Sequence, residues 1–300
     1  MIRRNTPCVS FIGFGEAGQA IAAGLRDAGI ERVVAWDILF PENAGAHLKA
    51  AGEAIGARMA SSAGDAVREA DIIISAVTAA SSVDAALSVA SHLTKNPYYL
   101  DINSVSPGRK QETAKLLNER ARYVDVAVIA AIYPARHRTP LLLSGPHAEE
   151  ISPLLHELDM QFSVVGPETG SAAAIKMIRS VMIKGIEALT LECFLAATRA
   201  GVLEEVTASL KNNYPTLDWS KIADYNLERM ASHGERRAAE MEESAATLRE
   251  LGLDPLMVDS TVRRQREMGT LGKQEVVRRT LKSGRAAMLD AINIASRDGH

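Results

Sequence analysis

The first half of the chain alternates short apolar runs with longer runs of helical pattern, and this alternation restricts the fold more than any other feature. Most of the apolar runs are continuous, as is typical of strands that are covered on both faces. Strands that alternate with helices of this length predict right-handed crossovers and a parallel sheet. The expected strands are Val9–Ile12, Val33–Trp36, Ile72–Val77, Tyr98–Ile102, Val124–Val128, Leu141–Ser144 and Phe162–Val165.

Helical patterns lie between most of these strands, and one connection lacks such a pattern. The expected helices of this half include Ala17–Ala28, Ser81–His92, Pro107–Arg120 and His147–Leu158. No helix is evident between Val128 and Leu141, so we expect these two strands to form an antiparallel hairpin at the sheet edge.

After Val165 the pattern changes from alternating to helical. The segment GPETG (166–170) has the proline and glycines of a domain boundary, and no later run predicts a strand. We therefore predict an α/β fold, with a doubly wound, mostly parallel sheet in residues 1–166 and an all-helical domain in residues 167–300. The expected helices of the second domain are Ser171–Ala200, Leu203–Asn212, Trp219–Ser232, Arg236–Leu251, Pro255–Met268 and Lys273–Ile294.

Composition excludes several classes of protein. A net charge of −3 argues against bulk electrostatic attraction to nucleic acid or to a membrane. The two cysteines, Cys8 and Cys193, are too few for a disulfide framework and suit a reducing compartment. The first residues, MIRRNTPC, make a poor signal peptide, and the apolar segment 171–198 carries charges that disfavour a membrane span. The expectation is a soluble cytoplasmic protein, and the seven histidines show no metal-ligand spacing.

The stretch FIGFGEAG (11–18) places three glycines between a predicted strand and a predicted helix. In that context Gly13 permits a tight turn, Gly15 lets the backbone approach a pyrophosphate, and Gly18 lets the helix pack closely on the strand. The helix N-terminus then offers N–H groups and a positive dipole end to phosphates. The stretch predicts a Rossmann-type dinucleotide site, whose loop contacts are Gly13, Phe14, Gly15, Glu16, Ala17 and Gly18.

A second strand ends at Asp37, about 20 residues after the last glycine. A carboxylate there can accept hydrogen bonds from both ribose hydroxyls and would repel a 2′-phosphate, which favours NAD but does not exclude NADP. The alternative is a glycine turn with an unrelated aspartate. Val77 and Thr78, after Ser75 at another strand end, are further candidates for cofactor contact, with ordinary loop capping as their alternative.

Lys176 is the candidate for proton transfer. It lies one turn into the long predicted helix, within AAAIKMI (172–178), where apolar neighbours reduce hydration and thereby lower the pKa of a lysine. Ser180 follows by four residues and so lies on the same helix face. The alternative, which the pattern leaves open, is a lysine that extends its amine into solvent.

Four motifs in order resemble the β-hydroxyacid dehydrogenase superfamily, which includes 3-hydroxyisobutyrate and 6-phosphogluconate dehydrogenases. FIGFGEAGQAIA (11–22) resembles its dinucleotide motif, and DINSVSP (101–107) resembles its aspartate–serine–proline motif, with Ser104 retained. DVAVIAA (125–131) occupies the place of its substrate-binding segment, and GSAAAIKMIRS (170–180) resembles the helix of its catalytic lysine. The resemblance covers most of the chain, more clearly before about residue 200.

The resemblance implies roles for particular residues. Lys176 would be the catalytic acid–base, Ser104 would lie near the nicotinamide and substrate, and Arg179 and Ser180 would contact substrate. The substrate segment departs from the family, because Ile129-Ala130-Ala131 stands where Ser-Gly-Gly is usual, and Ser180 stands where asparagine is usual. The chain therefore resembles a subgroup of 6-phosphogluconate-dehydrogenase-like proteins whose C-terminal domain has no assigned substrate.

The expected activity is NAD(P)-dependent oxidation of a hydroxyl group on a small anionic β-hydroxyacid or sugar-acid, in the cleft between the two domains. The family also implies a homodimer or a higher homo-oligomer. Three alternatives stay open: an imine reductase, although such enzymes usually lack this lysine; a non-catalytic NAD-binding regulator; and a dehydrogenase whose product loses carbon dioxide.

Overall fold

The computed structural model describes residues 7–297, which form two compact units divided between Lys176 and Met177. The first unit is built on an eight-stranded sheet in the order β3-β2-β1-β4-β5-β6-β7-β8, with every neighbouring pair parallel except β6 and β7. The strands are β1 (Val9–Ile12), β2 (Val33–Trp36), β3 (Arg58–Met59), β4 (Ile72–Ser75), β5 (Tyr98–Asp101), β6 (Arg122–Val128), β7 (Leu141–Ser144) and β8 (Phe162–Gly166). The predicted doubly wound, mostly parallel sheet is confirmed.

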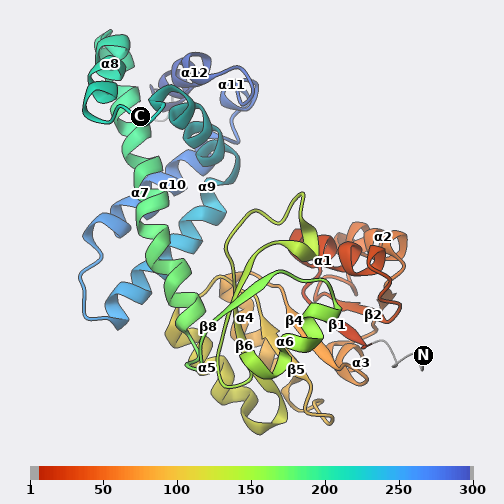
Figure 1. Cartoon of the computed structure of the whole chain (residues 1–300). Helices are drawn as coiled ribbons and strands as arrows, with labels where there is room; N and C mark the ends of the chain where they lie inside the picture. The colour runs from red at the N-terminus through yellow and green to blue at the C-terminus, as the bar shows by residue number, and fades with distance from the viewer. Residues whose placement is uncertain (1–6, 298–300) are drawn as a thin grey trace. The chain divides into compact units, whose positions relative to one another are not determined.

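Helices cover both faces of this sheet, because successive side chains of each strand point to opposite sides. Ile72 and Ile74 of β4 belong to the cluster that includes side chains of α1, α2 and α6, whereas Ile73 packs with side chains of α3, α4 and α5. Figure 1 shows the strands as arrows among these helices. The helices are α1 (Glu16–Asp27), α2 (Ala46–Ile55), α3 (Ala63–Val67), α4 (Ser82–Ala90), α5 (Pro107–Leu117) and α6 (Ala148–Glu157).

Two details of the predicted sheet are corrected. β3 was not among the predicted strands, because Arg58 and Met59 form only a short, partly exposed strand beside β2. The predicted β6–β7 pair is antiparallel as expected, but it does not end the sheet, because β8 pairs in parallel with β7 and forms the edge. The edge position suits β8, whose side chains are exposed or half-buried throughout.

The order of the central strands creates a topological switch point at their carboxyl ends. β1 lies between β2 and β4, so the connections that leave β1 and β4 run to opposite sides of the sheet. In doubly wound folds ligands bind at such a switch point. The loops that follow β1, β2, β4 and β5 therefore meet at one edge of the sheet.

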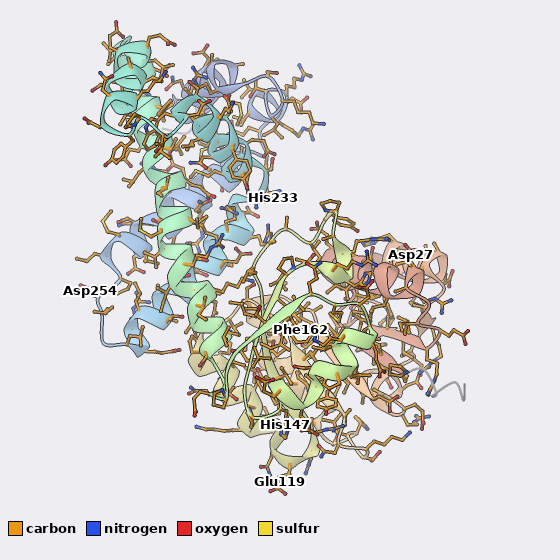
Figure 2. All side chains as sticks on the ribbon, in the orientation of Figure 1. Asp27, Glu119, His147, Phe162, His233 and Asp254 are labelled. Carbon is orange, nitrogen blue, oxygen red and sulfur yellow. The ribbon has the colours of Figure 1, made fainter. Side chains whose placement is uncertain are left out.

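Among its described residues, the second unit contains helices joined by turns and loops, and no strand. Its elements are the greater part of α7 (Ser171–Ala200), then α8 (Leu203–Asn213), α9 (Trp219–Glu250), α10 (Leu256–Leu271), α11 (Glu275–Arg278) and α12 (Arg285–Arg297). The turn in which Figure 2 labels Asp254 reverses the chain, and α10 then packs along α9.

Two of the predicted helices in this unit have different bounds. A break was predicted between Ser232 and Arg236, but α9 continues through Gly234, so His233 is an exposed residue in mid-helix (Figure 2). The predicted helix Lys273–Ile294 is interrupted before Arg285, where Gly284 has a φ of +81° that α-helix does not accommodate. Within residues 7–297, no helix is both long enough and apolar enough to cross a membrane.

Candidate functional site

The glycine loop after β1 contains two glycines that the fold requires and one that it does not. Gly13 has a φ of +90°, and a Cβ atom there would lie 2.4 Å from the Ala76 carbonyl oxygen. A Cβ on Gly18 would lie 2.7 Å from the Gly13 carbonyl oxygen. A Cβ on Gly15 would meet nothing within 4 Å. The loop therefore leaves open space beside Gly15, where a dinucleotide backbone contact is expected.

The same loop leads directly into α1. Gly15 is the N-cap of this helix, and no side chain caps it, so its first turn presents backbone N–H groups and the positive end of the helix dipole. Glu16 is exposed and Ala17 is half-buried. The Phe14 side chain is fully buried and packs edge-on against Phe40, so it is not exposed to a ligand.

Asp37 follows β2 and is bonded to this loop. Its Oδ2 accepts a hydrogen bond from the Phe14 N–H at 2.7 Å, and its Oδ1 accepts one from the Leu39 N–H at 3.0 Å. The side chain is half-buried. Because each carboxylate oxygen has two acceptor sites, Asp37 retains capacity for ribose hydroxyls while it fixes the loop.

The ends of β4 and β5 are joined through Asn103. Its Oδ1 accepts from the Val77 N–H at 2.7 Å, and its Nδ2 donates to Ser75 Oγ at 3.0 Å. A serine at this position has no amide group to bond both strands in this way. Val77 is half-buried against the Gly13 turn, whereas Thr78 is exposed and shares a hydroxyl contact of 3.1 Å with Ser81.

Lys176 and Ser104, which are 72 residues apart in the chain, meet in the first unit. Lys176 lies in the second turn of α7 and is half-buried, and its Nζ donates to Ser104 Oγ at 2.5 Å. Ser104 follows β5 at the same sheet edge as the glycine loop. An amine beside a hydroxyl at this edge is suited to bind an oxygen and to transfer a proton.

The predicted substrate segment follows β6. The Ile129 N–H donates to the Pro140 carbonyl at 3.2 Å, and Ile129 is half-buried, whereas Ala130 and Ala131 are exposed. These three residues present no side-chain hydrogen-bonding group, in keeping with their departure from the family pattern.

In the second unit, Ser180 is buried and Arg179 is exposed on α7. The buried Lys184 was not predicted as a site residue; its Nζ donates to Ser180 Oγ at 3.2 Å and lies 3.0 Å from the Glu240 carboxylate. Burial lowers the pKa of Lys184, and the Glu240 charge opposes that shift. The signal that could have revealed Lys184 was its spacing, four residues after Ser180 and thus on the same helix face.

A second unpredicted feature is a buried charged cluster in the first unit, formed by Asp101, Lys110 and Asp125. The available signal was an aspartate inside the apolar run YVDVAV (123–128). Within residues 7–297, no group of three or more histidine, cysteine, aspartate or glutamate side chains is arranged to hold a metal ion.

Comparison with protein families yields two matches along the chain. Residues 8–166 match the NAD binding domain of 6-phosphogluconate dehydrogenase. Residues 197–268 match a domain of unknown function, DUF1932.

Solved structures extend the similarity to nearly the whole chain. A conserved hypothetical protein from Sinorhizobium meliloti is 34% identical, with 97% of each chain covered and a TM-score of 0.77. The conserved protein MTH1747, described as structurally similar to 3-hydroxyacid dehydrogenases, is 31% identical over 87% of this chain and 96% of its own, with a TM-score of 0.70. The 3-hydroxyisobutyrate dehydrogenase of Mycobacterium tuberculosis, at 16% identity over 88% and 94% of the two chains and a TM-score of 0.70, shares the fold.

Proposed function

The chain belongs to the family whose dinucleotide domain is the NAD binding domain of 6-phosphogluconate dehydrogenase, and from this premise we propose an NAD-dependent dehydrogenase of small hydroxyacids. The substrate class is a β-hydroxyacid or a sugar-acid, and the reaction is reversible oxidation of its hydroxyl group. The likeness to MTH1747, whose description cites 3-hydroxyacid dehydrogenases, supports this class.

The observation that carries the proposal is the contact between Lys176 and Ser104. The amine and the hydroxyl lie 2.5 Å apart, come from α7 and from the loop after β5, and belong to the edge of the sheet that holds the glycine loop. A half-buried lysine with no role at this edge would be expected to extend into solvent. Its bond to a serine hydroxyl instead favours a role at the reacting oxygen.

The residues at the sheet edge fit a dinucleotide. The open space at Gly15 and the uncapped start of α1 suit a pyrophosphate, and the Asp37 carboxylate suits an unphosphorylated ribose. When bound, the nicotinamide ring supplies the acceptor for the hydride. Asp37 is the basis on which we propose NAD rather than NADP.

The chain's own residues then handle the proton. Lys176 in its amine form accepts the proton of the substrate hydroxyl during oxidation, and its ammonium form returns a proton to the carbonyl in the reverse reaction. Ser104 orients the amine and the substrate oxygen through its hydroxyl. We assign substrate contact to Ser104, Ile129 and Ala130, and, on α7, to Arg179 and Ser180.

A spectrophotometric screen tests the proposal. Purified protein is offered a panel of β-hydroxyacids and sugar-acids with NAD and with NADP in parallel, together with cyclic imines and NADH or NADPH. We expect reduction of NAD by one class of hydroxyacid, with the product examined for loss of carbon dioxide. NADH binding without oxidation of any acid would favour a regulator, and turnover of imines alone would favour an imine reductase.

The role of Lys176 is tested by measuring the turnover of a Lys176 variant with the substrate that the screen identifies. Lys176→Ala removes the proton acceptor, so kcat should fall by about 10²–10⁴-fold. The Kd for NADH, measured by fluorescence titration, should be nearly unchanged because the glycine loop is intact. Wild-type turnover in the variant would remove Lys176 from the mechanism.

We also propose that the helical region, residues 167–300, contributes substrate contacts and joins two copies of the chain. α7 exposes a row of apolar side chains, Ile178, Met182, Ile186 and Leu189, at helical spacing. An exposed apolar stripe of this length is typical of a surface that another chain covers.

A further inference from the structure

Three charged side chains of the first unit are at most 1% exposed and form one cluster. Lys110 comes from α5, and Asp101 and Asp125 are paired residues of the parallel strands β5 and β6. The Lys110 Nζ lies 3.0 Å from Asp101 Oδ1 and 3.4 Å from Asp125 Oδ1, and it donates to the Asp101 carbonyl at 2.5 Å. Two carboxylates thus share one ammonium group, which leaves one negative charge in excess.

The Asp125 carboxylate of this cluster is hydrogen-bonded to the start of α7. Asp125 Oδ2 accepts hydrogen bonds from the backbone N–H groups of Gly170 and Ala173, each at 3.1 Å. These groups belong to the end of the helix where the dipole favours a negative charge. A buried strand residue therefore caps the helix that carries Lys176.

Ser144 of β7 connects the Asp125 carboxylate to a third backbone N–H group of this turn, that of Ala172. Its Oγ donates to Asp125 Oδ2 at 2.9 Å and accepts from the Ala172 N–H at 3.0 Å. Ser144 is fully buried, so these two bonds are shielded from competition by water. The first turn of α7 is held from β6 and β7 together.

The other carboxylate holds the loop that carries Ser104. Asp101 Oδ1 accepts from the Asn103 N–H at 3.0 Å, and Oδ2 accepts from the Tyr123 hydroxyl at 2.8 Å. Asn103 directly precedes Ser104. The two aspartates therefore fix the two partners of the Lys176–Ser104 contact, one each.

Lys110 links these two anchors. Asp125 Oδ1 has no hydrogen-bond partner among the described residues, so the nearby Lys110 ammonium is the charge that compensates it. We propose that Lys110, with Asp101 and Asp125, is a positioning residue that sets the distance between Ser104 and the amine of Lys176. This inference rests on the proposed function, because it explains how that pair is held in its reactive arrangement.

A charge-rescue experiment separates this role from simple packing. Lys110→Met keeps the length of the side chain and removes the charge, and kcat should fall about 10- to 100-fold because the reacting groups shift, with the KM for NAD unchanged. Adding Asp101→Asn restores the original excess of one negative charge, because it removes one of the two carboxylates. The asparagine side chain can still accept a hydrogen bond from the Asn103 N–H. The double variant should recover about tenfold in kcat, which a packing role would not allow because the methionine side chain is still in place.

A second measurement does not depend on turnover. Backbone amides of residues 172–176 should exchange hydrogen about tenfold faster in Lys110→Met, because the cap on α7 is weakened. Ser144→Ala, a milder change, should accelerate the same amides and lower kcat about fivefold through loss of a hydrogen bond. Ser10→Ala is the matched control, because Ser10 is also a fully buried serine of this sheet but bonds to Ala66 instead.

Each outcome decides the inference. Unchanged exchange in both Lys110→Met and Ser144→Ala overturns it, as does faster exchange with wild-type kcat, or a loss of kcat in Ser10→Ala equal to that in Ser144→Ala. If the wild-type protein oxidises no hydroxyacid, the proposed function fails, and the exchange rates alone decide whether the cluster anchors α7. If Lys110→Met does not fold, Ser144→Ala supplies both measurements.

Discussion

Gly13 and Gly15 are two residues apart in one loop, yet their backbones meet different constraints. The positive φ of Gly13 and the nearby Ala76 carbonyl leave no room for a side chain, whereas Gly15 has a φ of −73° and open space around its missing Cβ. The first glycine is therefore required by the fold. The second is free for a ligand.

This contrast leads to a prediction with a built-in control. Gly15→Ala should change the free energy of unfolding by no more than about 1 kcal/mol, because its backbone conformation suits any residue. It should weaken NADH binding at least about tenfold, because the methyl group fills the space that a pyrophosphate needs. Calorimetry and a fluorescence titration with NADH give the two values.

Gly13→Ala serves as the comparison, and it should lower stability by about 2 kcal/mol or more through strain at positive φ and overlap with Ala76. Equal NADH affinity in Gly15→Ala and in the wild-type protein would mean that the glycines only form a turn.

A second prediction at the residue scale is that His137 makes the stability of the protein depend on pH. It is buried at 6% exposure, and neither ring nitrogen has a hydrogen-bond partner among the described residues. Burial lowers the pKa of His137, and the positive charge of Arg138 lowers it further. The unfolded chain therefore binds a proton at a higher pH than the folded protein does, and stability is lost as the pH falls below about 6.5.

Replacing this ring should flatten the dependence on pH. In His137→Leu, the free energy of unfolding in urea should change less between about pH 7.5 and pH 5.5 than in the wild-type protein, because the proton uptake is gone. His47→Leu, a change at an exposed histidine, controls for the loss of a histidine elsewhere. If the free energy of unfolding changes equally with pH in His137→Leu and in the wild-type protein, His137 is not the source of the pH dependence.

At the scale of elements, α9 and α10 approach each other through glycines. A Cβ on Gly234 would lie 2.3 Å from the Gln265 carbonyl and 2.4 Å from the Gly269 nitrogen, and a Cβ on Gly272 would lie 2.0 Å from the Ala231 carbonyl. The close approach explains why a glycine lies inside a long helix despite its low helix propensity.

Replacing Gly234 with alanine should destabilise the protein, although alanine has the higher helix propensity. Gly234→Ala should lower stability by about 1–3 kcal/mol through overpacking, seen as a reduced Tm in calorimetry. Gly185→Ala on α7 is the matched control, because a Cβ there meets nothing within 4 Å and alanine should add about 0.5–1 kcal/mol. A higher Tm in both variants would show that the two helices do not need the glycine.

At the scale of the whole molecule, the apolar row on α7 predicts self-association. Met182 and Leu189 are 65% and 59% exposed in the single chain, and burying such side chains in an interface is favourable. The wild-type protein should therefore elute as a dimer or larger oligomer in size-exclusion chromatography with light scattering. The double substitution Met182→Lys and Leu189→Lys should shift it towards the monomer.

Leu87→Lys provides the control, because Leu87 is a comparably exposed leucine, at 54%, on α4 of the first unit. A monomeric wild-type protein, or dissociation by the control as well, would remove α7 as the interface.

The sequence by itself determined the parts of this protein that depend on neighbours along the chain. Strands and helices alternate with periods that a short window reveals, and the glycine loop between β1 and α1 has backbone needs that only glycine meets. The long helix with Lys176 was predicted at its observed bounds, Ser171–Ala200, because its apolar pattern is continuous. The roles of the site residues and the domain boundary near residue 166 stay predictions.

Only the tertiary structure decided what lies together across the chain. The contact of Lys176 with Ser104, the link from Lys110 to both aspartates, and the passage of α9 through Gly234 all depend on packing between distant segments. Local propensity is weak compared with such packing, so neither the glycine inside α9 nor the burial of Lys110 has a local signature.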